Sequence, residues 1–177
     1  LYYHTLRHLK PRQIAGRLAA PVCQWCSNLP DVPSRVQGEL QAAVSFPEHD
    51  SENEASDLKQ GVFCFLNEKR GLGRPIRWTP NASLLWQFNL HYFAYLPLLH
   101  EDEQVEFCRE WMTANPSGTQ PGWQPYPTSL RIINWCKAEF EAKDLLRSLY
   151  HQAAYLDRNL ETHLLGNHLL ENARALV

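Results

Sequence analysis

The sequence predicts a mainly α-helical protein of successive helical hairpins, with one small β-hairpin. The first observation is that apolar residues recur every three or four positions in two blocks within residues 144–177, as on one face of an amphipathic helix. The second is that residues 84–96, 101–115 and 130–140 also carry apolar patterns of helical length. The third is a short alternating run at residues 61–66, which is typical of a strand. Helical hairpins in series suit a helical toroid or a bundle.

Residues 1–60 are predicted to be an N-terminal helical segment followed by a polar linker. Apolar residues at helical spacing continue to about Trp25, and the segment is basic, with no acidic residue before Asp31. We expect an exposed helix lying on the body of the protein, and a helix on a membrane surface is the alternative. Residues 27–60 are polar and contain three prolines, as in a linker with little core of its own. Residues 61–177 form the second unit.

The hairpin is expected near residues 61–79, with 61–66 as its first arm and 75–79 pairing back as its second. The next helix, 84–96, is apolar on most sides, so we expect it to be buried on several sides. Its polar exceptions are Asn89 and His91. Because buried polar groups need partners, these two are either satisfied core residues or groups that face a cleft.

The segment 115–127 is expected to be neither helix nor strand, because it contains four prolines and two glycines. A run of this length without regular structure inside a compact domain is usually functional. Its two aromatic residues are Trp123 and Tyr126. They either stack on sugar rings in a carbohydrate groove or fix the loop to the core.

Thr128 or Ser129 is predicted to cap the helix 130–140. Arg131 then falls in the first turn of that helix, where a cation is electrostatically disfavoured. We therefore expect Arg131 to have an anionic partner, either an external ligand or an internal carboxylate.

Residues 166–168 form the joint between the two apolar blocks near the end of the sequence. Gly166 interrupts the first block, as a residue just past a helix end does. Asn167 is a good N-cap for the second helix, and His168 follows in its first turn. An amide and an imidazole fixed side by side at a rigid corner can serve chemistry. The plainer interpretation is that Asn167 only caps the helix and His168 only belongs to its first turn.

Composition argues against several classes of function. The formal net charge of −2 lacks the basic excess that is typical of nucleic-acid-binding proteins. The sequence contains no run of 18 apolar residues, so no transmembrane helix is predicted. Five scattered cysteines are an odd number, so a disulfide framework is not expected. Cys23 and Cys26 have redox or half-zinc spacing without a second such pair, and His163 and His168 lie on either side of Gly166. We expect no metal site and no cofactor.

Four stretches, in order, resemble the N-terminal part of heparinase II/III-type polysaccharide lyases. The third and fourth are the most specific, and together the four cover most of the chain outside residues 20–60. The four stretches, in order, are residues 1–14, 85–93, 122–135 and 164–173. The resemblance implies an incomplete (α/α) toroid followed by a large antiparallel β-sandwich domain of the same parent chain. It also implies an acidic polysaccharide as the binding partner.

The family's reaction is β-elimination, which breaks the glycosidic bond at C4 of a uronic acid after the C5 proton is removed. A donor such as Asn stabilises the carboxylate of the enolate-like intermediate. A His or Tyr removes the proton, and a Tyr can protonate the leaving oxygen. The resemblance matches Asn167 to the carboxylate-binding Asn and His168 to the adjacent His as catalytic residues. The candidates for substrate binding are Asn89, His91, Trp123, Tyr126 and Arg131.

In that family, the catalytic Tyr and a second His lie beyond the position that matches Val177. We therefore expect this chain to be the front half of a lyase with a truncated toroid, inactive alone. The last helix, still apolar at Val177, favours the same interpretation. Residues 1–177 contain no segment with the pattern of a signal peptide, so we expect either a removed leader or an excerpt of a longer chain, with the bacterial periplasm and cytoplasm as alternatives.

Two other functions are compatible with the sequence. One is a non-catalytic glycan-binding or assembly module in capsule or exopolysaccharide biosynthesis. The other is a toroid hydrolase, which would need two carboxylates facing a cleft. Glu161 and Glu171 flank the joint but are ten residues apart on different predicted helices.

Overall fold

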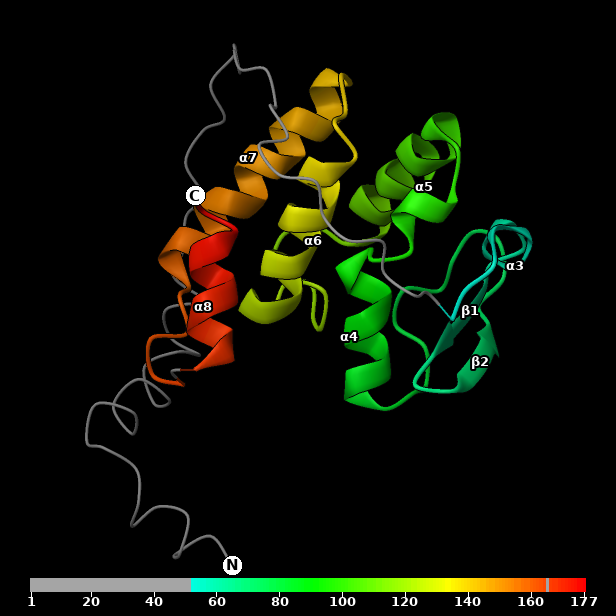
Figure 1. Ribbon diagram of the computed structural model, residues 1–177, viewed down its shortest axis with the longest axis horizontal. Helices are drawn as coiled ribbons and strands as arrows, with labels where there is room; N and C mark the ends of the chain where they lie inside the picture. The colour runs from blue at the N-terminus through cyan, green and yellow to red at the C-terminus, as the bar shows by residue number, and fades with distance from the viewer. Residues whose placement is uncertain (1–51, 165) are drawn as a thin grey trace, which may run out of the picture.

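The computed structural model describes residues 52–164 and 166–177, which form a mainly α-helical body with one small β-hairpin (Figure 1). This confirms the predicted mainly α class. The elements, in order, are α3 Ala55–Lys59, β1 Val62–Phe65, β2 Glu68–Gly71, α4 Leu84–Tyr92, the 3-10 helix η1 Leu96–Leu98, α5 Glu101–Ala114, α6 Pro125–Lys137, α7 Lys143–Arg158 and α8 Asn167–Arg174. The helix predicted up to Trp25 lies outside the described residues. No helix of the described ranges is long and apolar enough to span a bilayer.

The hairpin is tighter than the sequence analysis predicts. Strand β1 confirms the predicted first arm, but its antiparallel partner is β2, with Phe65 opposite Glu68. The second arm predicted at 75–79 is therefore wrong. The reason is the turn: Leu66 and Asn67 have φ values of 58° and 59°, the left-handed pair of a two-residue hairpin loop. The chain reverses within these two residues instead of across the longer segment between the two predicted arms.

The described end of the predicted linker belongs to the body of the protein. Helix α3 packs beside β1, and Leu58 in it is fully buried. The Asn53 side chain donates to the carbonyl of Cys64 at 2.9 Å and accepts from its backbone N–H at 2.7 Å. Asn53 thus pairs with β1 as a residue of a neighbouring strand would. The described end of the predicted linker is therefore part of the folded body.

Helix α4 is shorter than predicted, because Phe93 takes a left-handed conformation with φ of 60° and ends it. The same turn places Phe93 in an aromatic core. Its ring lies edge-on to Trp135 at 5.5 Å and to Trp111 at 6.2 Å, and the two indoles are 5.8 Å apart. All three side chains are buried, so the core of the helical body consists mainly of aromatic rings.

Helix α6 lies between α4 and α8 and also packs against α7 (Figure 1). It begins at Pro125, three residues before the predicted caps Thr128 and Ser129. Proline is favoured in the first turn of a helix because the N–H it lacks has no partner there, so the segment 115–127 ends in helix rather than loop. As a consequence, Arg131 is the seventh residue of α6 and does not lie in its first turn.

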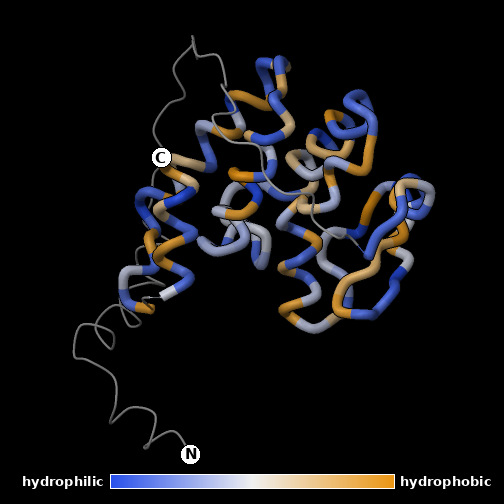
Figure 2. The backbone as a smooth tube through the Cα atoms, viewed as in Figure 1, coloured by the Kyte–Doolittle hydropathy of each residue, from blue (hydrophilic) through white to orange (hydrophobic). Residues whose placement is uncertain are grey.

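The joint between α7 and α8 is partly as predicted. Gly166 has a φ of 65°, in the left-handed region that glycine enters without strain. It occupies the N-cap position, so Asn167 is the first residue of α8 and not its cap. Helix α7 ends earlier than predicted, at Arg158. Figure 2 shows hydrophobic and hydrophilic positions alternating along the helices, as amphipathic packing requires.

Candidate functional site

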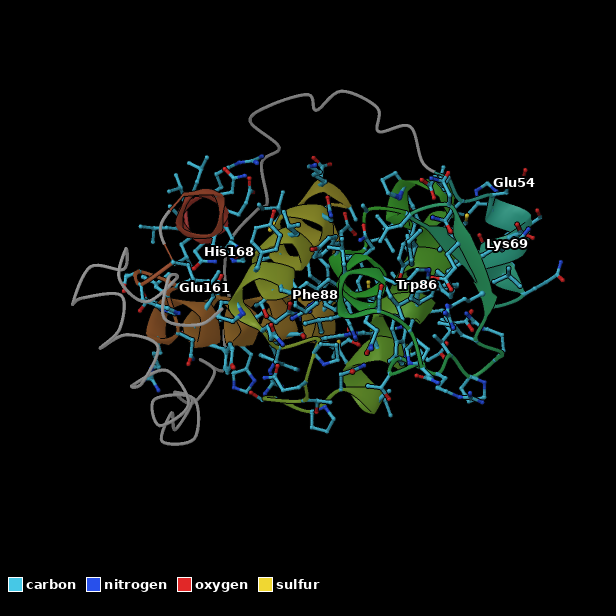
Figure 3. All side chains as sticks on the ribbon, turned by 90° about the horizontal axis from the view of Figure 1, so that it is seen from below. Glu54, Lys69, Trp86, Phe88, Glu161 and His168 are labelled. Carbon is cyan, nitrogen blue, oxygen red and sulfur yellow. The ribbon has the colours of Figure 1, made fainter. Side chains whose placement is uncertain are left out.

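The predicted catalytic pair lies in the first turn of α8, at the surface. Asn167 is exposed, and the side chain of His168 is 42% exposed. Figure 3 shows His168 beside Glu161, between α8 and the rest of the body. The amide at position 167 is therefore accessible to a ligand, which is the condition that a role in substrate binding requires.

A cluster of polar and aromatic side chains supports His168, and we call it the α6–α8 corner. Its members are Tyr126, Ser129, Glu161, His168 and Asn172. His168 Nδ1 lies 3.1 Å from Glu161 Oε2. On its other side, the imidazole contacts the Tyr126 ring, with centroids 4.5 Å apart. Both neighbours fix the position of the imidazole.

Asn172 holds the corner together from below. It is fully buried, its Oδ1 accepts from the backbone N–H of Glu161 at 2.9 Å, and its Nδ2 donates to Ser129 Oγ at 2.9 Å. The same Nδ2 lies 3.5 Å from Glu161 Oε2. Ser129 in turn donates to the carbonyl of Pro125. Asn172 therefore ties α8 both to α6 and to the connection that carries Glu161.

This geometry suits proton transfer at His168. When neutral, an imidazole that donates its Nδ1 hydrogen to Glu161 keeps its lone pair on Nε2, where it can accept a proton. The carboxylate then stabilises the imidazolium that forms. Burial, together with the nearby charges of Glu171 and Glu161, raises the pKa of Tyr126, so its phenol stays protonated at neutral pH. The arrangement is that of a general base with a carboxylate orienting it.

His91, a predicted cleft residue, belongs to the interior instead. It is fully buried, and its Nδ1 accepts from Trp111 Nε1 at 3.0 Å. Burial and the charge of Arg131 lower the pKa of His91 to about 3, although the Trp78 carbonyl acts in the opposite direction. Gly122 packs so closely that an added Cβ would lie 2.8 Å from the His91 ring. His91 is thus a neutral core residue with a satisfied acceptor.

Arg131 is also fully buried, and its partners are neutral. It donates to Gln152 Oε1 at 2.7 Å and to the carbonyl of Gly122 at 2.6 Å, and its guanidinium lies 3.9 Å from the centre of the Trp111 ring. Within residues 52–164 and 166–177, no carboxylate pairs with it. Burial lowers its pKa to about 9. The internal carboxylate that the sequence suggests is not found among the described residues, and full burial keeps Arg131 away from external ligands. The neutral acceptors and the indole hold this cation instead.

The remaining predicted substrate-binding residues are dispersed. Trp123 is buried and donates to the carbonyl of Asn115 at 3.0 Å, so its indole fixes the loop to the core. Tyr126 is only partly buried and belongs to the corner. Asn89 lies on α4 and donates to the carbonyl of Leu85. The structure therefore brings Tyr126 to His168, the neighbour of Asn167, but it does not bring Asn89, His91, Trp123 or Arg131 there.

Glu161, Asn172 and Ser129 complete the corner, and the sequence analysis did not assign them to it. Two signals were available in the sequence. Glu161 flanks the joint, and His168 and Asn172 are four residues apart, on one face of α8. No group of three or more metal-ligating side chains occurs among the described residues.

Comparisons with known proteins add no identification. No protein-family model, no curated protein and no solved structure matches the chain. Inference about function therefore rests on the geometry of the corner and on the motifs in the sequence.

Proposed function

We propose that this chain carries part of the active site of a polysaccharide lyase, which cleaves uronic-acid-containing glycans by β-elimination. The observation that supports this most directly is the exposed amide of Asn167 beside His168, whose imidazole is held by Glu161 at 3.1 Å. The resemblance of residues 122–135 and 164–173 to heparinase II/III-type lyases adds the reaction class. The parent chain is then expected to continue into a β-sandwich domain.

The helical body is, in this proposal, part of an (α/α) toroid. The packing of α6 against α4, α7 and α8 supports it, because toroids are built from neighbouring helical hairpins. The loop and helix ends on one side of such a ring form its substrate cleft. Asn167 and Tyr126 both lie in first turns, those of α8 and α6, which is where residues of such a cleft are expected.

Asn167 is assigned to the substrate carboxylate. Its side-chain N–H groups can donate to a carboxylate oxygen, and the first turn of α8 adds unpaired backbone N–H groups and the positive end of the helix dipole. These donors stabilise the negative charge that the carboxylate gains as the C5 proton leaves. The effect is stronger in the enolate-like intermediate than in the ground state, which is the requirement for catalysis.

His168 is assigned to the C5 proton. Its Nε2 takes the proton, and the electrons of the C5–H bond pass to C5 and the carboxylate as an enolate. When the C4–O bond breaks, these electrons form the C4=C5 double bond, and the leaving oxygen requires a proton from an acid. By the resemblance, that acid is a tyrosine beyond Val177. This assignment is the reason why the 177-residue chain alone is expected to be inactive.

The test uses the full-length protein that contains this chain, with uronate polymers as substrates. Turnover is followed as ultraviolet absorbance of the unsaturated product. Asn167→Ala is expected to lower kcat/KM by about 10²–10³, the usual effect of losing one donor to an oxyanion. The control is Asn81→Ala, which removes an exposed amide outside the corner.

Three results would contradict the proposal. Unchanged turnover in Asn167→Ala would exclude the amide and favour a non-catalytic glycan-binding module. Product without a double bond would favour hydrolysis. Robust turnover by the 177-residue chain alone would show that the acid lies within it. Circular dichroism of each variant checks that a loss of activity is not a loss of fold.

A further inference from the structure

The α6–α8 corner contains a fully buried amide, that of Asn172 in α8. Burial keeps this amide away from any substrate, so it acts only through its neighbours in the folded chain. We infer that Asn172 is a positioning residue: it fixes Glu161 so that neutral His168 carries its hydrogen on Nδ1 and its lone pair on Nε2. The inference rests on the proposed function for its role in catalysis, because only there does Nε2 take the C5 proton.

The orientation of the Asn172 amide follows from its partners. The backbone N–H of Glu161 can only donate, and it lies 2.9 Å from one end of the amide, which is therefore the acceptor Oδ1. The other end is then Nδ2, which donates to Ser129 Oγ at 2.9 Å. The Ser129 hydroxyl can accept there because it donates its own hydrogen to the carbonyl of Pro125 at 2.9 Å. Each bond in this series thus runs in one direction only.

Two contacts of Asn172 hold Glu161 in place. The first is the bond from the Glu161 backbone to Oδ1, which fixes the connection between α7 and α8. The second involves the remaining hydrogen of Nδ2, because Glu161 Oε2 lies 3.5 Å from that nitrogen, a long contact that still places a donor beside the oxygen. The Glu161 side chain is 12% exposed, so few water molecules compete for this oxygen. The carboxylate is therefore held from the interior.

The same oxygen, Glu161 Oε2, lies 3.1 Å from His168 Nδ1, and Figure 3 shows the two side chains beside each other. An ionised carboxylate has no hydrogen to give, so a neutral imidazole bonds to it by donating from Nδ1. Nε2 then has no hydrogen and can accept a proton. The other tautomer would place a hydrogen where a general base needs its lone pair, which is the defect seen when the orienting carboxylate of a catalytic triad is replaced by an amide.

The second carboxylate of the joint, Glu171, has a different partner. Both of its oxygens accept from Arg174 Nη1, at 3.0 and 2.9 Å. The side chains of Glu161 and Glu171 are similarly buried, with 12% and 15% exposure. The two residues therefore form a matched pair: the same substitution removes the carboxylate that contacts His168 in one case and a carboxylate paired with arginine in the other.

The spectroscopic experiment uses the 177-residue chain, labelled with ¹⁵N in its histidines, without substrate. Long-range ¹H–¹⁵N correlation at about pH 8.5, where unperturbed imidazoles are neutral, shows which ring nitrogen carries the hydrogen. We expect the Nδ1–H form for His168 in the wild type. Asn172→Ala and Glu161→Gln are each expected to lower the ratio of the Nδ1–H to the Nε2–H form about fivefold or more, the effect of one lost hydrogen bond. Glu171→Gln should keep the wild-type ratio.

The kinetic experiment uses the full-length protein that contains this chain, with a uronate polymer as substrate. Asn172→Ala is expected to lower kcat about tenfold and to leave KM within about twofold, because the Asn167 amide that binds the carboxylate remains. Glu161→Gln is expected to lower kcat by about 10² or more, the usual contribution of a positioned base. Asn172→Asp removes the donor without changing the shape of the side chain, and it replaces Asn172→Ala if circular dichroism shows that the alanine variant does not fold.

The two experiments separate this inference from the proposed function. Wild-type His168 in the Nε2–H form, or a ratio that the substitutions of Asn172 do not change, would refute the positioning role even in an active lyase. An equal change in Glu171→Gln would show a general effect of charge and would also refute it, as would a raised KM with unchanged kcat in the Asn172 variant. If the tautomer responds as expected but the full-length protein has no lyase activity, Asn172 still positions His168 and only the proposed function is wrong.

Discussion

Gly122→Ala tests whether the loop before α6 has room for any side chain against the core. An added Cβ would lie 2.8 Å from His91 Nδ1 and 2.9 Å from its Cε1, which is closer than side-chain carbons approach other atoms. The imidazole has no easy way to withdraw, because it is fully buried and accepts from Trp111 at 3.0 Å. We expect the overpacking to lower the free energy of unfolding by about 1–3 kcal/mol.

Urea unfolding followed by tryptophan fluorescence measures this cost. With a slope of about 1–3 kcal/mol per molar urea, a loss of about 2 kcal/mol moves the midpoint by roughly 1 M. The matched control is Gly71→Ala, because no atom lies within 4 Å of the Cβ it would add. That variant is expected to change stability by no more than about 0.5 kcal/mol.

A double-mutant cycle separates the clash from other effects of alanine. When His91→Ala has removed the ring, adding Gly122→Ala should cost less than about 0.5 kcal/mol, so the two substitutions should be non-additive. If Gly122→Ala keeps its full cost in that background, the contact with His91 is not the cause and the reasoning is refuted.

Two further predictions concern stability. The pKa of His91 is lowered to about 3 in the folded chain, so between about pH 6.5 and 3 only the unfolded chain binds this proton, and stability falls as the pH falls. The loss in the free energy of unfolding reaches about 4–5 kcal/mol near pH 3. Urea midpoints measured from pH 7 to pH 3 should therefore decline less steeply in His91→Gln than in the wild type. If the midpoints of the two proteins decline in parallel, the prediction is wrong. Asn172→Ala leaves the Glu161 N–H unpaired and should cost about 2–3 kcal/mol. Asn167→Ala, at an exposed amide, should cost less than about 0.5 kcal/mol, and equal costs would show that Asn172 does not hold the corner.

The helices could be predicted from the sequence where local rules dominate. Helix α5 begins and ends within a residue of its predicted limits, because its apolar spacing and flanking residues agree. Gly166 separates the two helices as predicted and has a φ of 65°, but it is the N-cap of α8 and not the residue just past the end of α7, which ends at Arg158. The second arm of the hairpin could not be found by composition, because Leu66 adopts a conformation that its residue type disfavours.

The candidate site was predictable only in part. A pattern identifies Asn167 and His168 as neighbours, but the partners Glu161 and Ser129 come from other segments that tertiary packing brings together. Arg131 shows the opposite problem. A charged residue is expected at the surface or beside an acid, whereas here neutral acceptors and an indole surround it. Whether Asn167 binds a uronate is not decided by its position, and it stays a prediction.

Gly122 and Trp123 are adjacent in the chain, yet they belong to different environments. The backbone of the first lies against His91 and accepts from Arg131, while the buried indole of the second donates to the carbonyl of Asn115. A single peptide unit therefore connects the contact with the His91–Arg131 pair to the contact with Asn115. Because the carbonyl that Arg131 donates to and the indole that donates to Asn115 belong to neighbouring residues, the loop before α6 and the buried cation are held in place together.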